Sequence, residues 1–204
     1  ELCDEALRVS RILARLAPEE PEVHGLVALM EIQASRAAAR IKADGTPILL
    51  LDQDRTRWNQ LLIRRGLVAL GVAEQLGGAH GPYALQAAIA ACHARARKAA
   101  DTDWTRIAAL YDELAMLTPS PIIELNRSVA HAMAFGPEAG LRLLEPLMEA
   151  PLLKNYHLLP SVRGDFLSRI GRFDEARAEF QRAAAMTGNA REKELLLKRA
   201  AGQA

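Results

Sequence analysis

The chain has 204 residues, of which half are hydrophobic, 38 are alanine and only 9 are aromatic. Lys and Arg number 26 against 25 Asp and Glu, and the formal net charge of +1 excludes a wholly basic nucleic-acid binder. No apolar run approaches the roughly 20 residues that span a bilayer, and the acidic start contains no signal-peptide hydrophobic region. Because alanine has the highest helix propensity, the composition favours closely packed helices. We expect a soluble, cytoplasmic protein with no membrane partner.

Two helices are predicted before residue 45. An apolar stripe at spacings of three and four residues marks the first helix, and it consists of Leu2, Ala6, Val9, Leu13 and Leu16. Pro18 ends that helix, and Pro21 suits the first turn of the next. The second helix is predicted to run to about Ala43.

The segment between residues 44 and 55 is irregular in its pattern. Residues 44–47 read as a turn, and residues 48–51 are the only plausible strand-like run in the chain. That run is too short and isolated to imply a sheet. A helical pattern resumes near Thr56 and continues to a glycine pair at 77–78, a typical C-terminal stop.

The second half of the chain is regular. Prolines and glycines separate helical patterns, with Asp101 or Asp103 as the expected cap of the one that begins at Trp104. The remaining helices are predicted at 82–98, 104–118, 121–135, 139–148, 155–170, 173–187 and 190–201. The sequence therefore predicts an all-α fold of about ten helices in antiparallel hairpins.

Residues 157–190 partly fit the 34-residue period of tetratricopeptide (TPR) repeats. Gly164 stands where two helices must approach closely, and the small–aromatic–small ridge of the second helix follows at Ala176, Phe180 and Ala183. Departures from the repeat are Pro160, Arg163 and Gly188. We predict a TPR-like right-handed array over residues 81–204, after an N-terminal helical part at 1–80, the two forming one continuous unit.

No motif for phosphate, dinucleotide, zinc or serine-hydrolase chemistry is present. The five histidines are spread along the chain without an i,i+4 pair, and the two cysteines are far apart, at Cys3 and Cys92. We expect no metal, no cofactor and no catalytic activity. His93, next to Cys92, points about 100° away from it on a helix, and we expect it to be a core or surface histidine whose hydrogen bonds are satisfied.

The most distinctive polar cluster lies at residues 52–58. Asp52 and Asp54 alternate like calcium ligands, but Thr56 and Arg57 break the EF-hand pattern. The favoured interpretation is a helix start with Trp58 folded inward, in which either Asp54 is the N-cap or Asp52 and Asp54 stabilise the exposed amides of the first turn. A recognition surface of charges with a tryptophan is the alternative.

A second cluster lies at residues 81–93. Tyr83, Ala87 and Ala90 share one face of the expected helix, while Gln86 and His93 share another. These polar groups either line a groove between hairpins or are buried and fix helix register. Together the candidate interaction surface comprises Asp52, Gln53, Asp54, Arg55, Trp58, Tyr83, Gln86, His93, Asp103, Trp104, Asn126 and Arg127.

Several motifs occur in a fixed order along the chain: LDQDRxxW at 51–58, GPYxLQAAIAAxH at 81–93, TDW at 102–104, PSPxxxLNR at 119–127, RGDFL at 163–167 and GR at 171–172. Together with the opening LCDEA at 2–6 and PEVxGLxALM at 21–30, this order resembles the C-terminal, TPR-like extension of bacterial extracytoplasmic-function (ECF) RNA polymerase sigma factors. The resemblance covers essentially the whole chain. The family's two sigma domains are not within these residues, and no basic helix-turn-helix is present.

The resemblance implies a non-catalytic regulatory domain of a sigma factor. Its partners would be the sigma domains of the same full-length protein, RNA polymerase and promoter DNA through those domains, and an unidentified regulatory protein. Two other hypotheses stay open. A free-standing TPR-like adaptor would bind a peptide or protein in its groove, and an enzyme or small-molecule sensor would bring His93, Asp103 and Glu124 into one polar pocket.

Overall fold

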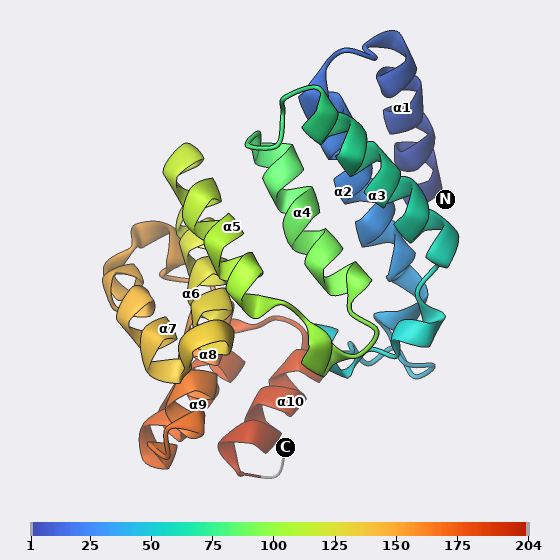
Figure 1. Ribbon diagram of the computed structural model, residues 1–204. Coiled ribbons are helices and arrows are strands. Elements are labelled where there is room, and N and C mark those ends of the chain that lie inside the picture. The colour runs from blue at the N-terminus through green and yellow to red at the C-terminus, as the bar shows by residue number, and fades with distance from the viewer. Residues whose placement is uncertain (1, 203–204) are drawn as a thin grey trace. The chain divides into compact units, whose positions relative to one another are not determined.

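The computed structural model describes residues 2–202 and shows an all-α protein, as predicted (Figure 1). The α-helices of the described chain are α1 (Leu2–Leu16), α2 (Pro21–Ser35), α3 (Gln60–Gln75), α4 (Pro82–Arg95), α5 (Trp104–Leu117), α6 (Pro121–Phe135), α7 (Pro137–Leu144), α8 (Leu158–Arg169), α9 (Phe173–Met186) and α10 (Ala190–Ala200). None of the helices described is long and apolar enough to cross a membrane. Short 3₁₀-helices occupy several connections: η1 (Ala37–Ala39), η2 (Leu50–Asp52), η3 (Arg55–Arg57), η4 (Ala99–Asp101), η5 (Glu145–Glu149) and η6 (Pro151–Leu153).

The second helix ends earlier than the sequence predicts, at Ser35 rather than near Ala43. The Ser35 carbonyl, which would accept from Ala39 in a continuing helix, instead accepts from the Asn59 backbone N–H at 2.9 Å. The Ala39 N–H turns back to the Arg36 carbonyl and begins the tighter 3₁₀ geometry. A contact far along the chain thus ends this helix, and local periodicity does not contain that information.

The chain divides into two compact units between Leu117 and Thr118. This division differs from the predicted boundary at residues 80 and 81. The physical reason is that α4 packs on α2, and both share one hydrophobic cluster with α3. The N-terminal unit therefore contains α1 to α5, and the C-terminal unit contains α6 to α10.

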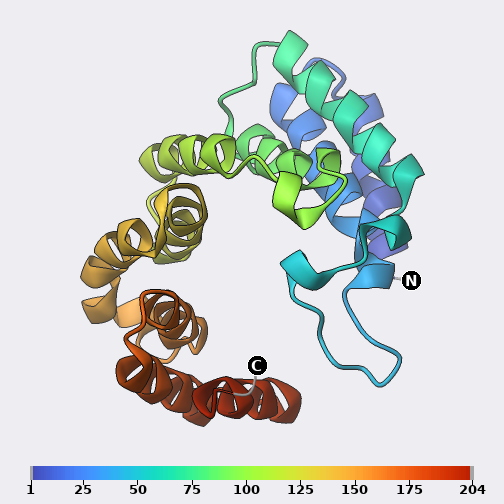
Figure 2. The same cartoon turned by 60° about the horizontal axis from the view of Figure 1, so that its bottom comes forward.

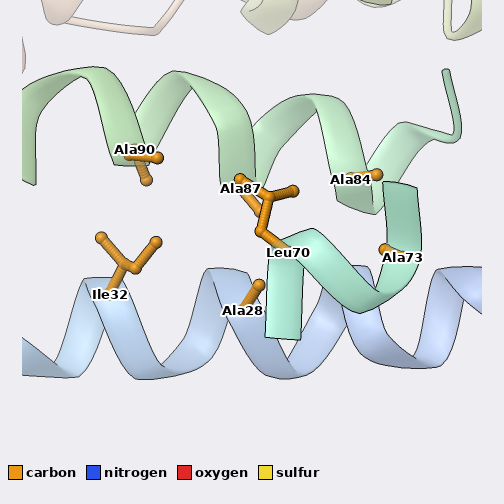
Figure 3. Packing of buried hydrophobic residues seen from close by; sticks show 8 residues of the cluster. Ala28, Ile32, Leu70, Ala73, Ala84, Ala87 and Ala90 are labelled. Carbon is orange, nitrogen blue, oxygen red and sulfur yellow. The ribbon is translucent and has the colours of Figure 1, made fainter. Parts of the chain in front are cut away.

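Alanine dominates the core of the N-terminal unit (Figure 3). Ile32 of α2 points toward Ala90 of α4, and Leu70 of α3 lies between Ala28 and Ala87. Because most of these side chains are single methyl groups, the helix backbones approach closely. The space between the helices is therefore narrow, and it has little room for larger side chains.

Helical hairpins build the C-terminal unit, with α6 packed on α7, α8 on α9 and α9 on α10. A Cβ atom at Gly164 of α8 would lie 2.9 Å from the Phe180 ring of α9, so glycine permits this close approach, as the sequence predicted. The expected ridge is buried, at Ala176, Phe180 and Ala183. Hairpins with these contacts are consistent with a TPR-like array, which remains a prediction.

Candidate interaction site

The segment between α2 and α3 makes an irregular excursion that carries the predicted polar cluster (Figure 2). Asp54 is the N-cap of the short helix η3, because its Oδ1 accepts from the Thr56 backbone N–H at 2.9 Å and from the Thr56 hydroxyl at 2.6 Å. These hydrogen bonds hold the pKa of Asp54 below its usual value. The long helix predicted from Thr56 instead begins at Gln60, where the Asn59 side chain is the N-cap. Asp52 is exposed. No group of three or more acidic, His or Cys side chains suited to a metal ion occurs in the described part of the chain.

Arg55 ties this excursion to the far end of α4. Its Nη1 donates to the carbonyls of His93 (2.6 Å) and Ala96 (2.8 Å), and its Nη2 donates to the Thr102 hydroxyl (3.1 Å). The last carbonyls of a helix have no helical N–H partner and carry the negative end of the helix dipole. Arg55 therefore caps α4 from a distant segment and holds the connection to α5.

Trp58 is buried, as predicted, and packs with Ala39 and Ile63. The guanidinium carbons of Arg36 and Arg55 lie 5.7 and 5.1 Å from the centre of its ring, within the range of cation–π attraction. Burial and the neighbouring positive charges lower the pKa of Arg36 to about 10. This cluster of two arginines about a tryptophan joins the excursion to the end of α2.

His93 is buried at the C-terminal end of α4, with its ring edge on Trp104 of α5 at 5.1 Å between centroids. Burial first, and then the charges of Arg36 and Arg55, lower the pKa of His93 to about 4. The imidazole is therefore neutral near pH 7. Of the two predicted locations, core and surface, His93 occupies the core. Its Nδ1 has no hydrogen-bond partner in the described structure, so the expected hydrogen bonding is incomplete.

Other predicted residues act at helix ends. Asp103 caps α5, as predicted, because its Oδ1 accepts from the Arg106 backbone N–H at 2.9 Å. Half-buried Gln86 donates to the Pro82 carbonyl at 3.0 Å, and Tyr83 is exposed at the start of α4. Gln53 donates to the Ile48 carbonyl at 3.2 Å.

The structure thus brings together part of the predicted surface. The side chains of Arg55, Trp58, His93 and Trp104 meet at the C-terminal end of α4, whereas Tyr83 and Gln86 lie near its start. Asn126 and Arg127 belong to α6 in the other unit, where Arg127 pairs with Glu124 at 3.0 Å. The sensor hypothesis combined Glu124 with residues of the N-terminal unit, and its common pocket stays a prediction.

Sequence reasoning missed an exposed apolar surface on α1. Most of the stripe that the periodicity identified faces solvent, and Leu2 (85 % exposed) and Leu16 (77 %) are its extremes. We define the α1 outer stripe as the exposed residues Leu2, Val9, Ile12, Leu13 and Leu16. Leu7 and Ser10 are the buried residues of α1 instead. The available signal was the row of small residues Cys3, Ser10 and Ala14 on the adjacent face of the helix.

A groove also lies between α1 and α3, with residues of α2 at its floor, and it has a volume of about 840 Å³. We call it the α1–α3 groove. Its walls carry Arg15 from α1 and Leu61, Arg64, Arg65 and Val68 from α3. Its floor contains the buried Glu31 of α2, which accepts from Arg11 Nε at 2.7 Å.

The three helices that form the groove, α1, α2 and α3, lie almost entirely within the part of the chain that matches a family model. Residues 1–74 match a family model described as a family of unknown function, DUF6596. An uncharacterized protein of Rhizobium meliloti (strain 1021) is 48 % identical over 192 residues, which cover 94 % of this chain and 45 % of that protein. The chain thus spans less than half the length of the curated relative that it matches. No solved structure matches the chain.

Proposed function

We propose that this chain is a non-catalytic regulatory and protein-interaction domain of an ECF sigma factor, where it modulates promoter-directed transcription initiation by RNA polymerase. The ordered motifs at 51–58, 81–93, 102–104 and 119–127 support this proposal by their resemblance to that family. The length of the Rhizobium meliloti relative also supports it, because more than half of that protein lies outside the match and leaves room for further domains.

The α1 outer stripe is the observation that carries the proposal. Large apolar side chains rarely form a continuous exposed stripe on a protein that acts alone, and such surfaces mark contacts with other domains or proteins. Leu2, Val9 and Leu16 extend over four turns of one helix face. In the proposed arrangement this stripe contacts the sigma domains of the same polypeptide, which themselves bind RNA polymerase and promoter DNA.

The test uses the full-length protein in a reconstituted transcription assay. We expect the double substitution Val9→Glu and Leu13→Glu to change promoter output at least about threefold, because two charges would face an apolar contact. Both residues are exposed, so the domain itself should remain folded by circular dichroism. Leu152→Glu, at a residue 79 % exposed in the C-terminal unit, is the matched control. Unchanged output with both α1 charges, on every promoter tried, contradicts the proposal.

The alternative is a free-standing TPR-like adaptor, and the close packing of Gly164 on Phe180 favours it. The intact mass of the native gene product separates the two functions. A mass near 22.3 kDa, that of this chain, favours the adaptor, whereas about twice that mass favours the sigma factor. For an adaptor, Tyr83→Ala or Gln86→Ala should weaken partner binding without unfolding. Trp58 is unsuitable for that test because it is buried.

A further inference from the structure

The α1–α3 groove has the length and regularity of a helix-binding surface. Leu61, Arg65, Val68 and Val72 of α3 follow at intervals of four, three and four residues, so they form one continuous wall. Leu61 and Val72 are eleven helical positions apart, a span of about 17 Å or three turns. Val27 of α2 and Ala14 of α1 provide apolar surface along the floor and the opposite wall.

The walls combine exposed apolar groups with arginines that lack carboxylate partners. Val68 is 69 % exposed and Leu61 is 50 % exposed. Within residues 2–202, no ion pair or hydrogen bond engages the side chains of Arg15, Arg64 or Arg65. By contrast, the nearby arginines Arg8 and Arg11 of α1 bind Glu5 and Glu31. The walls of the groove therefore carry three arginines that no acidic side chain among residues 2–202 pairs with.

The floor of the groove supplies a second, independent indication of a ligand. Glu31 is only 1 % exposed, and its Oε1 accepts a hydrogen bond from Arg11. Its Oε2 has no hydrogen-bond partner in the described structure. A buried carboxylate oxygen left without a donor is costly, so a donor supplied by a bound partner would be favoured at this point.

We propose that the α1–α3 groove binds an amphipathic helix of a partner protein, about three turns long. One face of that helix has apolar side chains at i, i+3 or i+4 and i+7, as in other helix-in-groove complexes. Carboxylates flank this stripe and pair with Arg15, Arg64 and Arg65, and one hydrogen-bond donor faces Glu31. The inference rests on the geometry of this unit and holds whether or not the chain belongs to a sigma factor.

The experiment selects helical peptides against the immobilised chain. The library fixes a leucine stripe at i, i+3, i+4 and i+7 and randomises the flanking positions among Glu, Lys, Ser and Ala. We expect enrichment of Glu at positions flanking the stripe. Individual enriched peptides are then synthesised with a fluorophore, and their dissociation constants are measured by anisotropy, together with a Lys-for-Glu version of each peptide. The Lys versions should bind at least about tenfold more weakly.

Charge-reversal variants locate the binding. Arg64→Glu with Arg65→Glu should weaken the acidic peptides at least about tenfold and strengthen the Lys versions, and Val68→Asp should weaken both. All three side chains are exposed, so folding should persist. Arg142→Glu, at an exposed position of α7 in the other unit, is the matched control and should change neither affinity.

Two further probes separate this occupant from other anionic ones. Vesicles containing an acidic phospholipid and a random-sequence DNA duplex are titrated against the same variants. Groove-dependent binding of either probe in preference to the peptides overturns the proposal. It is also overturned by a library without enrichment, by enriched flanks that lack acidic residues, or by equal affinity in the wild type and the Arg64→Glu, Arg65→Glu variant.

Discussion

The principal hydrophobic clusters of the two units contain side chains of different size. In the N-terminal unit, Ala28, Ala84 and Ala87 bring helix backbones together, and the large side chains of the α1 outer stripe remain exposed. In the C-terminal unit, Phe166 and Phe180 fill the spaces between neighbouring helices, against Gly140 and Gly164. The first unit consequently leaves a groove and an exposed apolar stripe, features suited to binding. We therefore expect truncation of buried side chains to lower the free energy of unfolding most in the C-terminal unit. Enlargement of buried side chains should lower it most in the N-terminal unit.

The largest effect is expected from Phe180→Ala. The ring is buried against Gly164, and Arg199 lies over it at 4.4 Å, so truncation removes many contacts and leaves a cavity. We expect a loss of about 3–5 kcal/mol in the free energy of unfolding, measured by urea denaturation. Phe173→Ala, at a residue 65 % exposed in the same helix, should cost little. Equal losses in the two variants would contradict the role given to Phe180.

The reverse test adds atoms to the alanine core. Ala87→Leu should lower the free energy of unfolding by about 3 kcal/mol, because Ala87 is fully buried against Leu70 and Ala28 and no space accepts three more carbons. Ala109→Leu, at an exposed position of α5, is the control and should be nearly neutral. A stable Ala87→Leu variant would mean that the N-terminal core has room, and would end the contrast between the units.

Local patterns predicted most helices because prolines and glycines mark their ends. Pro82, Pro121 and Gly171 bound helices close to where the sequence placed them. The early end of α2 at Ser35 was not predictable in this way, since its cause is a bond from Asn59. The division at Leu117 also depends on which helices share a core, and a linear pattern does not specify that.

Local chemistry likewise predicted part of the candidate site. The cap at Asp103 follows from short-range rules and is confirmed, whereas Asp54 caps only η3 and Asn59 caps the long helix α3. The meeting of Arg55 with His93, 38 residues away, follows from tertiary packing. The periodicity located the apolar side chains of α1 but not which of its two faces is buried, because small residues on a helix form an equally good contact surface with α2.

The capping contact of Arg55 offers a smaller effect within the N-terminal unit. Arg55→Ala removes three hydrogen bonds and leaves the carbonyls of His93 and Ala96 without that donor, so we expect a loss of about 2 kcal/mol. Hydrogen exchange should accelerate at the end of α4 more than in α8. The neighbouring exposed Arg57→Ala is the control. Uniform acceleration in both units would show that Arg55 does not act locally.

The smallest expected effect is a pH-dependent change in stability, and it tests whether His93 is buried and neutral in the folded N-terminal unit. The pKa of His93 is about 4 in the folded protein against 6.5 for the free group, so only the unfolded chain gains the proton as the pH falls from 6.5 toward 4. The contribution of neutral His93 to stability is therefore complete above pH 6.5 and is lost as the pH falls from 6.5 toward 4. The free energy of unfolding should fall by about 1 kcal/mol between pH 7.5 and 5.5.

Urea denaturation at those two pH values measures this loss directly. Because Gln does not titrate, His93→Gln should show a stability difference between pH 7.5 and 5.5 that is smaller than that of the wild type by about 1 kcal/mol. Ala109→Gln, at an exposed position of α5 without a titratable group, is the control and should retain the wild-type difference. If the His93 variant keeps the full wild-type difference, then the desolvated pocket formed by Arg36, Arg55 and Trp104 does not hold His93 neutral, and the α4 end is more open to water than its packing indicates.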